Sequence, residues 1–592
     1  MADGMRREID FLLYDWLRAE TLTQSDVFSG QERGDWEAFL DLSGAISWNE
    51  FLPCYKIADH EEPFLQDGQV IVQKDLKQAL QTYIEAGLHL ATVDPENGGM
   101  GFPFAVASAA MAELMAANVA GSGFVMLSIA NARMIADFGS PEQIAAFAEP
   151  QFQGAALGTM CLSEPDTGSS LGDVTTRATP DGEDSLGLRY RIRGRKMWIS
   201  AGDQDVTGNV IHLVLGKVVQ PDGSTVPGPK GTSLFVVPKI LPENLGSTRN
   251  DVAVAGLNHK MGYRGTPNCL LNFGENDGAI GWRIGAEGDG LRIMFQMMNE
   301  ARTNVGLGGA AVAYRGYMLA RSYASERIQG RPVHDKQIEK PVPILCHPDV
   351  RRMLLVQKTI SEGALALCLK SAMLCDLLRA HQDPVQKDRA RSLLELLTPV
   401  IKSWPSEQGL VALHQAIQVH GGYGYTRDFD VEQLYRDSRL NPIHEGTTGI
   451  QAIDLLGRKI LGDGGASFAV FLDEVRGTVA RAGAFPDEAE KLSGLCDLFD
   501  GLVRDLLAQN APADALSNAG AFLDGFGHMV LAWIWLDLAI AAQAATDAAM
   551  AEEKRWACRF FYAVEVPKIP GMLALLREQQ SLTRDVPDHV LI

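Results

Sequence analysis

One carboxylate, Glu445, lies among small residues directly before an apolar helical pattern. The sequence of residues 441–451 reads NPIHEGTTGIQ. The start of a helix carries the positive end of the helix dipole, and the neighbouring glycines leave room for a flat cofactor or a thin ligand to approach the carboxylate. A general base is one interpretation of this pattern. A carboxylate that only caps the helix beginning near Ile450 is the simpler one when the stretch is taken by itself.

Two further segments could surround a flat ring. Residues 158–170 read GTMCLSEPDTGSS, a strand that runs into a turn rich in hydroxyl groups and glycine, where N–H and O–H donors converge. A simple hairpin loop explains that turn as well. In residues 195–202, strand alternation places Trp198 and Ser200 on one face. A tryptophan on a strand most often belongs to a core, but here it could instead form the wall of a ring-binding site.

A third segment, residues 418–425, reads QVHGGYGY and follows a helical pattern. Paired glycines permit backbone contact with a pyrophosphate, and they also end helices. The chain contains neither a GxGxxG motif nor a P-loop motif. This absence argues against a doubly wound nucleotide-binding domain.

Composition limits the class of protein. The chain has 592 residues, which predicts three or four folding units, and 46% of them are hydrophobic, as in globular proteins. The net charge of −21 disfavours non-specific binding to nucleic acid or anionic lipid. Eight cysteines without a CxxC pair, together with a polar N-terminus, predict a reduced cytoplasmic protein. The most apolar run, residues 529–540, is interrupted by Asp537 and is too short to span a membrane, so we expect a buried helix.

Hydrophobic periodicity divides the chain into four parts and predicts a multidomain α+β protein. Alternating strand patterns occur between residues 190 and 273, and helical spacing dominates on both sides of them. The predicted domains are an N-terminal helical domain with an extension (1–155), a central β domain (156–280), a helical bundle (281–461) and an appended helical domain (462–592). Long helices are expected at 291–328, 349–378 and 389–419.

Read together, these segments resemble the acyl-CoA dehydrogenase family. That family has a helical domain, a β domain and a four-helix domain in this order, and it binds FAD between the last two. The resemblance covers roughly residues 76–461. The length of the chain, its GTTG sequence and its extra C-terminal domain resemble those of the longer bacterial branch of the family. That branch includes 3-methylmercaptopropionyl-CoA dehydrogenases and medium- to long-chain enzymes. Four segments carry it: LSEP at 162–165, KMWIS at 196–200, QVHGG at 418–422 and EGT at 445–447.

The resemblance implies an activity and a cofactor site. Glu445 would remove the α proton of an acyl-CoA thioester and FAD would accept the β hydride, which gives a trans-2-enoyl-CoA. The residues implied beside the flavin ring are Met160, Leu162, Ser163, Trp198 and Ser200. The residues implied along the rest of FAD are Gln418, Gly421, Gly422 and Thr447, with Arg327 reaching from a neighbouring subunit.

The resemblance also implies a substrate site. Ser169 would contact CoA, Asn299 and Arg302 would hold its adenosine and phosphate end, and His444 and Gly446 would line the acyl pocket. His444 stands where many relatives have tyrosine, Gly449 replaces a side chain that usually contributes at the cofactor, and Gln329 and Gly330 follow Arg327 without the common Thr-Phe. These departures leave the acyl group open: a medium- or long-chain fatty acyl group or a 3-methylmercaptopropionyl-like group.

Some relatives place the base at the position of Ala301, which cannot act as one, so adjacent Glu300 is the competing carboxylate. The resemblance further implies an electron-transferring flavoprotein as acceptor and a homodimer. An oxidase that passes electrons to oxygen stays open. So does a flavin-containing relative that binds DNA through the appended domain, although acidic residues crowd its basic ones, which are Lys554, Arg555, Arg559 and Lys568. We predict no nucleic-acid partner and no membrane span.

Overall fold

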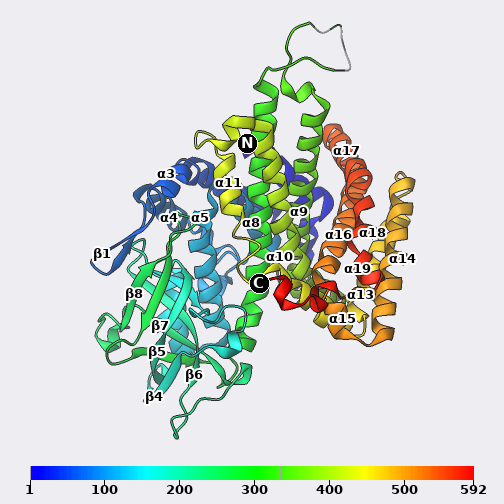
Figure 1. Cartoon of the computed structure of the whole chain (residues 1–592). Coiled ribbons are helices and arrows are strands. Elements are labelled where there is room, and N and C mark those ends of the chain that lie inside the picture. The colour runs from blue at the N-terminus through cyan, green and yellow to red at the C-terminus, as the bar shows by residue number, and fades with distance from the viewer. Residues whose placement is uncertain (1, 334–336, 338) are drawn as a thin grey trace. The chain divides into compact units, whose positions relative to one another are not determined.

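The structure is a computed structural model that describes residues 2–333, 337 and 339–592, residues 296–299 without their side chains (Figure 1). The chain forms two compact units. One, called unit 1 here, comprises Met1–Arg33, Pro103–Ala112 and Arg302–Ile592. The other, unit 2, comprises Gly34–Phe102 and Glu113–Ala301. The predicted four-domain boundaries stay a prediction.

Unit 2 contains an eight-stranded, mostly antiparallel sheet in the order β10-β7-β6-β4-β5-β9-β8, with β3 parallel to β6. Strand β10 also pairs with β5, so five of the strands close into a ring. Strands β6 and β7 are buried along nearly their whole length because both of their faces are covered, which explains their continuous apolar runs. The strands are β3 Ala156–Cys161, β4 Arg177–Asp184, β5 Gly187–Ser200, β6 Asn209–Val218, β7 Thr232–Pro238, β8 Val252–Leu257, β9 Asn268–Phe273 and β10 Ala279–Ile284.

The helices of unit 2 precede the sheet in the chain. Helix α5 packs against the sheet, and its buried Asn131 donates to the carbonyls of Thr159 (2.9 Å) and Ile211 (3.0 Å). A short hairpin interrupts the helices, with Asp67 and Gly68 at its turn, and the helical interpretation of this region missed it. The elements are α2 Arg33–Ile46, α3 Tyr55–His60, β1 Phe64–Gln66, β2 Gln69–Ile71, α4 Lys74–Glu85 and α5 Phe104–Phe138, whose first nine residues belong to unit 1.

Three long helices form the centre of unit 1, as predicted: α8 Gly290–Glu326, α9 Pro348–Ala380 and α10 Pro384–His420. Helices α8 and α10 cross closely, since a Cβ added to Gly306 would lie 2.0 Å from the carbonyl oxygen of Ile401. That carbonyl has lost its helical N–H donor, because Pro405 occupies the position four residues later. Two shorter helices, α11 Val431–Ser438 and α12 Thr448–Ile453, flank the loop that carries Glu445.

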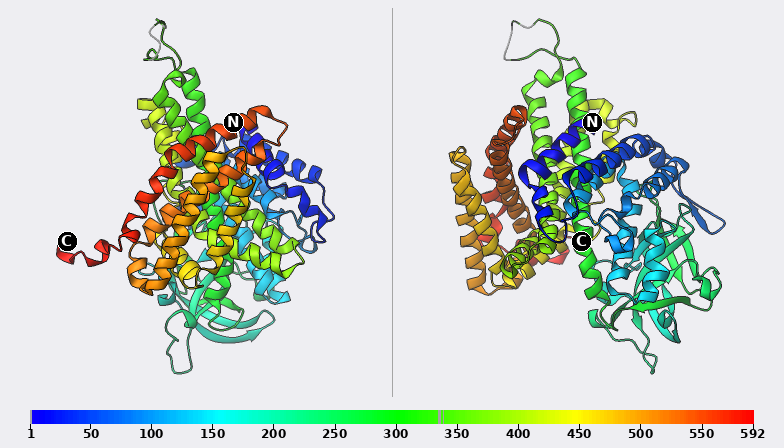
Figure 2. Two further views of the ribbon diagram at one scale, coloured as in Figure 1. Left: turned by 90° about the vertical axis from the view of Figure 1, so that its right-hand side faces the viewer. Right: turned by 180° about the vertical axis from the view of Figure 1, so that it is seen from behind.

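The appended helices belong to the same unit as α9 and α10. Their orange and red ribbons gather together in both views of Figure 2. Trp535 of α16 donates its indole N–H to the carbonyl of Thr359 on α9 at 3.1 Å. Gly363 lets this indole approach, because an added Cβ would lie 2.8 Å from Nε1. These helices are α13 Ala466–Arg481, α14 Pro486–Gln509, α15 Pro512–Leu516, α16 Ala519–Ala542 and α17 Ala548–Val564. The predicted fold class is confirmed: helical, β and helical domains followed by an extra helical domain.

Two helices, α5 and α16, are long and apolar enough to cross a membrane by length and composition. The most apolar window of each is 83% buried within the protein. Core helices of globular proteins have the same length, composition and burial. The run at residues 529–540 lies within α16 and is a buried helix, as predicted.

Candidate active site

Glu445 lies in a backbone elbow in the left-handed region. Its φ is +54°, and that of Gly446 is +91°. A left-handed conformation is costly for a residue with a Cβ and persists only where the surroundings enforce it. The cap of the following helix is Thr447, whose hydroxyl accepts the N–H of Ile450 at 3.4 Å. The interpretation of Glu445 as the helix cap is therefore wrong, and its carboxylate is left for another role.

Neighbouring contacts hold the elbow in place. The Glu445 carbonyl accepts a hydrogen bond from the side-chain amide of Gln451, a fully buried residue, at 3.2 Å. The hydroxyl of Thr448 donates to the carboxylate of Glu407 on α10 at 2.6 Å. A Cβ added to Gly446 would lie 2.6 Å from Gln451 Nε2, so only glycine fits there. The elbow is thus fixed to the helix that follows it and to α10.

Electrostatics suit a base at this position. Burial raises the pKa of the Glu445 carboxyl, and the opposing charges of Arg302 and Lys402 offset only part of that rise. A carboxylate with a raised pKa is a stronger base than an exposed one. Burial and the charge of Lys402 lower the pKa of adjacent His444 to about 3, so this imidazole is neutral and does not compete for the proton.

Arg302 lies beside Glu445 with its side chain buried. It forms an ion pair with Asp454 at 3.3 Å, and their side chains are 6% and 5% exposed. Its Nε has no hydrogen-bond partner in the part of the chain that the structure describes. The assignment of Arg302 to the adenosine and phosphate end of CoA stays a prediction. The charge of this residue acts on Glu445.

Lys402 on α10 is a buried charged residue that the sequence interpretation missed. It is fully buried and contributes its charge to the surroundings of Glu445. The sequence does contain a pattern that could have indicated this buried lysine. Lys402 interrupts the mostly apolar run LLTPVIKSWP at residues 396–405. Lysine is almost never fully buried without a charged or polar counterpart.

In unit 2, the structure brings together two of the segments implied beside the flavin ring. The buried ammonium of Lys196 contacts the carbonyl of Leu162 and the carboxylate of Glu164, both at 3.0 Å. The N–H of Met197 donates to the carbonyl of Ser163 at 3.0 Å. The segments at 162–165 and 196–200 are therefore joined side by side, with a buried ion pair at the junction.

Trp198 protrudes from this junction. The register of β5 with β9 shifts between Lys196 and Ile199, and Trp198 within the shift has a φ of +66°. A β-bulge with a left-handed residue redirects a side chain out of the strand alternation. The indole is 59% exposed, so the interpretation of Trp198 as a core residue is wrong. Met160 is buried, and Leu162, Ser163 and Ser200 are half-buried.

In unit 1, the segment implied at the pyrophosphate forms the exposed end of α10. Gln418, Gly421 and Gly422 are all exposed, and Gly421 is the C-cap with a φ of +62°. A Cβ added to either glycine meets no protein atom within 4 Å, so the backbone is open to a ligand. Within unit 1, an exposed amide group and an accessible glycine turn are groups that fit the pyrophosphate part of a dinucleotide. Unit 1 also contributes Thr447, which is exposed.

The remaining implied residues are less constrained. Arg327 is exposed directly after α8 and donates to the side chain of Gln329 at 2.7 Å. Ser169 is exposed, and Asn299 lies outside the described side chains. The competing carboxylate, Glu300, forms an ion pair with Arg133 of α5 at 3.2 Å. This ion pair engages the Glu300 carboxylate, which disfavours Glu300 as the base.

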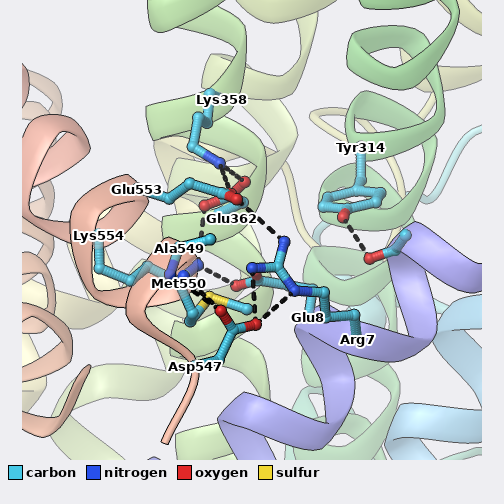
Figure 3. A network of polar contacts seen from close by, with 11 residues as sticks. Arg7, Glu8, Tyr314, Lys358, Glu362, Asp547, Ala549, Met550, Glu553 and Lys554 are labelled. Atoms are coloured by element: carbon cyan, nitrogen blue, oxygen red, sulfur yellow. Dashed lines mark hydrogen bonds and ion pairs between the residues drawn. The ribbon is translucent and has the colours of Figure 1, made fainter. Parts of the chain in front are cut away.

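One of the four basic residues named for the DNA-binding alternative is buried. Figure 3 shows Lys554 of α17 turned into a buried network with Glu8 and Glu362. Its side chain is fully buried and 2.8 Å from Glu362. This burial removes one of the four basic residues of the DNA-binding alternative. The other three are exposed, and Lys568 pairs with Glu565 at 2.6 Å.

Four family models match the chain in succession. Their descriptions are acyl-CoA dehydrogenase N-terminal domain (residues 56–155), middle domain (159–275) and C-terminal domain (288–461), and acetyl-CoA dehydrogenase C-terminal like (471–587). The last match falls on the appended helices.

Several characterised proteins are similar to this chain along most of their length. A 3-methylmercaptopropionyl-CoA dehydrogenase of Ruegeria pomeroyi is 35% identical over 90% of this chain and 89% of its own. A broad-specificity linear acyl-CoA dehydrogenase of Mycobacterium tuberculosis is 33% identical over 82% of this chain and 81% of its own. A butyryl-CoA dehydrogenase of Syntrophomonas wolfei is 30% identical over 99% and 98%.

Solved structures share the fold. ACDH-11 of Caenorhabditis elegans superposes with a TM-score of 0.76 at 20% identity, covering 92% of this chain and 90% of its own. Butyryl-CoA dehydrogenase of Megasphaera elsdenii superposes with a TM-score of 0.57 at 21% identity, covering 71% and 97%. The first structure covers a larger share of this chain than the second does, so the likeness in fold extends beyond three domains.

Proposed function

The chain belongs to the acyl-CoA dehydrogenase family and is an FAD-dependent enzyme of that class, and on this premise we propose that Glu445 is its catalytic base. Glu445 removes the α proton of the acyl-CoA thioester, and its backbone N–H donates to the thioester carbonyl. Bound FAD supplies the acceptor for the hydride that leaves the β carbon. The observation that carries this proposal is the strained elbow, which holds a partly buried carboxylate of raised pKa.

Arg302 supports the base. Its guanidinium is held by Asp454 and acts on Glu445, so it lowers the energetic cost of an ionised carboxylate in a partly buried position. A fixed positive charge at this place also favours the negative charge that develops on the thioester oxygen when the α proton leaves.

The substrate we propose is a linear acyl-CoA of medium to long chain or a 3-methylmercaptopropionyl-like acyl-CoA. The relatives from Ruegeria pomeroyi and Mycobacterium tuberculosis support these two classes respectively. Neutral His444 beside the base favours an uncharged acyl group, since it provides no countercharge. Turnover of straight, branched and thioether acyl-CoAs with an artificial electron acceptor distinguishes the classes; turnover of none of them would contradict the proposal.

An electron-transferring flavoprotein is the acceptor that we propose, in keeping with the family. The alternative, an oxidase, predicts peroxide from substrate and oxygen alone at the rate of substrate loss. Arg327 at the exposed end of α8 supports a homodimer in which this residue reaches the cofactor of the other copy. Mass measurement in solution tests the dimer, and Arg327→Ala tests whether FAD retention depends on that residue.

The decisive experiment compares Glu445→Gln with Glu300→Gln. We expect Glu445→Gln to keep FAD and bind acyl-CoA while its kcat falls at least ~100-fold, the usual contribution of a general base. Glu300→Gln is the matched control and should keep wild-type turnover within a few-fold, because it loses only a partly exposed ion pair. Normal turnover of Glu445→Gln, or loss of turnover in Glu300→Gln alone, would refute the assignment.

A further inference from the structure

Unit 2 encloses a pocket that the proposed reaction does not use. The pocket has a volume of about 680 Å³, within the usual size range of small-molecule sites. Its walls come from the end of α4, the turns that follow this helix, the end of α7 (Glu149–Phe152) and the loop before β6. All of its lining residues belong to unit 2. The described residues that line it include none that the family resemblance implies at FAD or acyl-CoA.

Direct contacts hold the walls of this pocket together. Gln81 of α4 donates its side-chain amide N–H to the carbonyl of Val206 at 3.3 Å, which joins the helix to the loop before β6. Gly154, with a φ of +73°, lies directly against Ile84, because an added Cβ would lie 2.2 Å from Cγ2 of that residue. The pocket is therefore formed by packing within the protein and does not need a ligand to create it.

His89 contributes an unused hydrogen-bond acceptor to the pocket. Its Nε2 lies 3.0 Å from the carbonyl oxygen of Phe152, and because a carbonyl only accepts, Nε2 carries the proton. Burial lowers the pKa of His89, so the imidazole is neutral and Nδ1 keeps its lone pair. The residue is only 9% exposed, and Nδ1 has no hydrogen-bond partner within the described residues. An unpaired buried acceptor is unfavourable, so a donor on a bound molecule would stabilise it.

The charge of the pocket favours a cation. Among the described lining residues, Glu85 is the only carboxylate, and there is no lysine or arginine. Glu85 is exposed at the end of α4 and makes no hydrogen bond or ion pair within the described part of the chain. Gly87, with a φ of +70°, turns the chain between Glu85 and His89, which places both acceptors on one tight turn. A second acyl-CoA would find no cation here for its phosphates.

The rest of the lining favours an organic cation over a metal ion. Ile84, Leu90, Phe152 and Val206 supply an apolar surface that can cover a hydrocarbon chain. A protein metal site usually needs three or more ligating side chains. No group of three such side chains exists among the described residues.

We propose that this pocket binds a primary alkylamine. The ammonium head donates to Nδ1 of His89, Glu85 supplies the countercharge, and the hydrocarbon chain packs on the apolar lining residues. The role of Glu445 does not enter this proposal, so the two stand or fall separately.

Calorimetric titration of the full-length, FAD-loaded protein with hexylamine is the test. We expect saturable binding of one molecule per chain. Hexanoate, which has a similar length and the opposite charge, should bind at least ~10-fold more weakly, because it places a carboxylate beside two acceptors. Hydrogen exchange should slow in residues 81–98 and 150–156 when hexylamine is added, and the flavin spectrum should stay unchanged.

Three variants locate the site. Glu85→Gln and His89→Phe should each weaken hexylamine binding ~10-fold or more, since each removes one acceptor of the ammonium. Glu96→Gln is the matched control, because Glu96 is an exposed carboxylate on the next turn and does not line the pocket. Retained FAD shows that each variant is folded. If His89→Phe does not fold, Glu85→Gln carries the test alone, because residue 85 is exposed.

Several results would overturn the proposal. They are the absence of binding at millimolar hexylamine, equal binding of hexylamine and hexanoate, and wild-type affinity in Glu85→Gln. Protection from exchange elsewhere in the chain, with residues 81–98 unaffected, would place the amine at another site and would also overturn it.

Discussion

Two residues that the family resemblance implies at the site, Glu445 of unit 1 and Trp198 of unit 2, adopt left-handed backbone conformations with φ values of +54° and +66°. Such a conformation costs roughly 1–3 kcal/mol for a residue with a side chain. Glu445 precedes a helix cap, and Trp198 occupies a β-bulge within β5. At Trp198 the strained residue turns its side chain out of the strand, where it is 59% exposed. The cost is concentrated where the family resemblance places the chemistry.

Gly446→Ala tests how strictly the elbow is constrained. The new Cβ would lie 2.6 Å from Gln451 Nε2, and the backbone φ of +91° disfavours alanine. We expect a loss of about 1–3 kcal/mol in the free energy of unfolding, together with reduced turnover because Glu445 is displaced. Denaturant unfolding and steady-state kinetics measure the two effects.

Gly449→Ala is the matched control three residues later. It lies in α12, where an added Cβ meets only Thr447 Oγ1 at 4.0 Å. The free energy of unfolding should stay the same or rise by up to ~1 kcal/mol, because alanine restricts the unfolded chain. Equal destabilisation by both substitutions would show that the elbow has no special requirement for glycine.

At the scale of elements, a buried ion pair joins the segment at 162–165 to the segment at 196–200, which carries Trp198. Glu164 accepts two backbone N–H groups and two hydroxyl groups from Thr175 and Thr176, at 2.6–3.0 Å. Burial would raise the pKa of Glu164, but Lys196 and these four donors outweigh it and lower the pKa to about 2. A depressed pKa stabilises the fold above the ordinary carboxyl range. That contribution is lost as the pH falls from about 4.5 toward 2.

Lys196→Met should therefore weaken this junction. Removing one partner of a buried pair costs about 3–5 kcal/mol. We expect lower stability at neutral pH and weaker FAD retention, measured by unfolding and by flavin absorbance after gel filtration. Lys77→Met, which removes a partly exposed pair with Asp205, should cost at most ~1 kcal/mol. Wild-type FAD retention in Lys196→Met would contradict a role of the junction in holding the cofactor segments.

At the scale of the whole chain, the network in Figure 3 links three distant parts of unit 1. Helix α1, Ala2–Asp10, contributes Glu8, helix α9 contributes Glu362, and helix α17 contributes Lys554 between them. Lys358 adds a second pair with Glu362. The first residues of the chain are thus joined to the appended domain through buried charges. This domain is part of the folded core of unit 1.

Lys554→Met should destabilise unit 1 by about 3–5 kcal/mol, because Glu8 would be left buried without its cation. Lys568→Met is the comparison, since its pair with Glu565 involves a half-exposed lysine and should contribute at most ~1 kcal/mol. Denaturant unfolding of both variants, with hydrogen exchange of α1 and α17 amides, measures the difference. Equal stability of the two variants would show that the network does not hold the terminal segments.

Local sequence patterns determined most elements of this fold. Apolar spacing predicted α8, α9 and α10 nearly to their ends, and the apolar run at 529–540 predicted the buried helix α16. Glu445, Trp198 and the glycines after α10 were recognised because their neighbours are unusual for ordinary strands and helices. The β1–β2 hairpin was missed although the signal is present: Asp67-Gly68 is a preferred two-residue turn.

Only the tertiary structure decided which charges act on Glu445. Arg302, Lys402 and Glu445 are separated by 100 and 43 residues in the sequence and meet through the packing of α8, α10 and the loop before α12. Burial sets the strength of their interactions, and it depends on contacts that no local pattern contains. Likewise, alternation placed Trp198 on a regular strand face, whereas a bulge against β9 turned it outward. The sequence alone determines the residue types, but long-range packing determines their electrostatic environment.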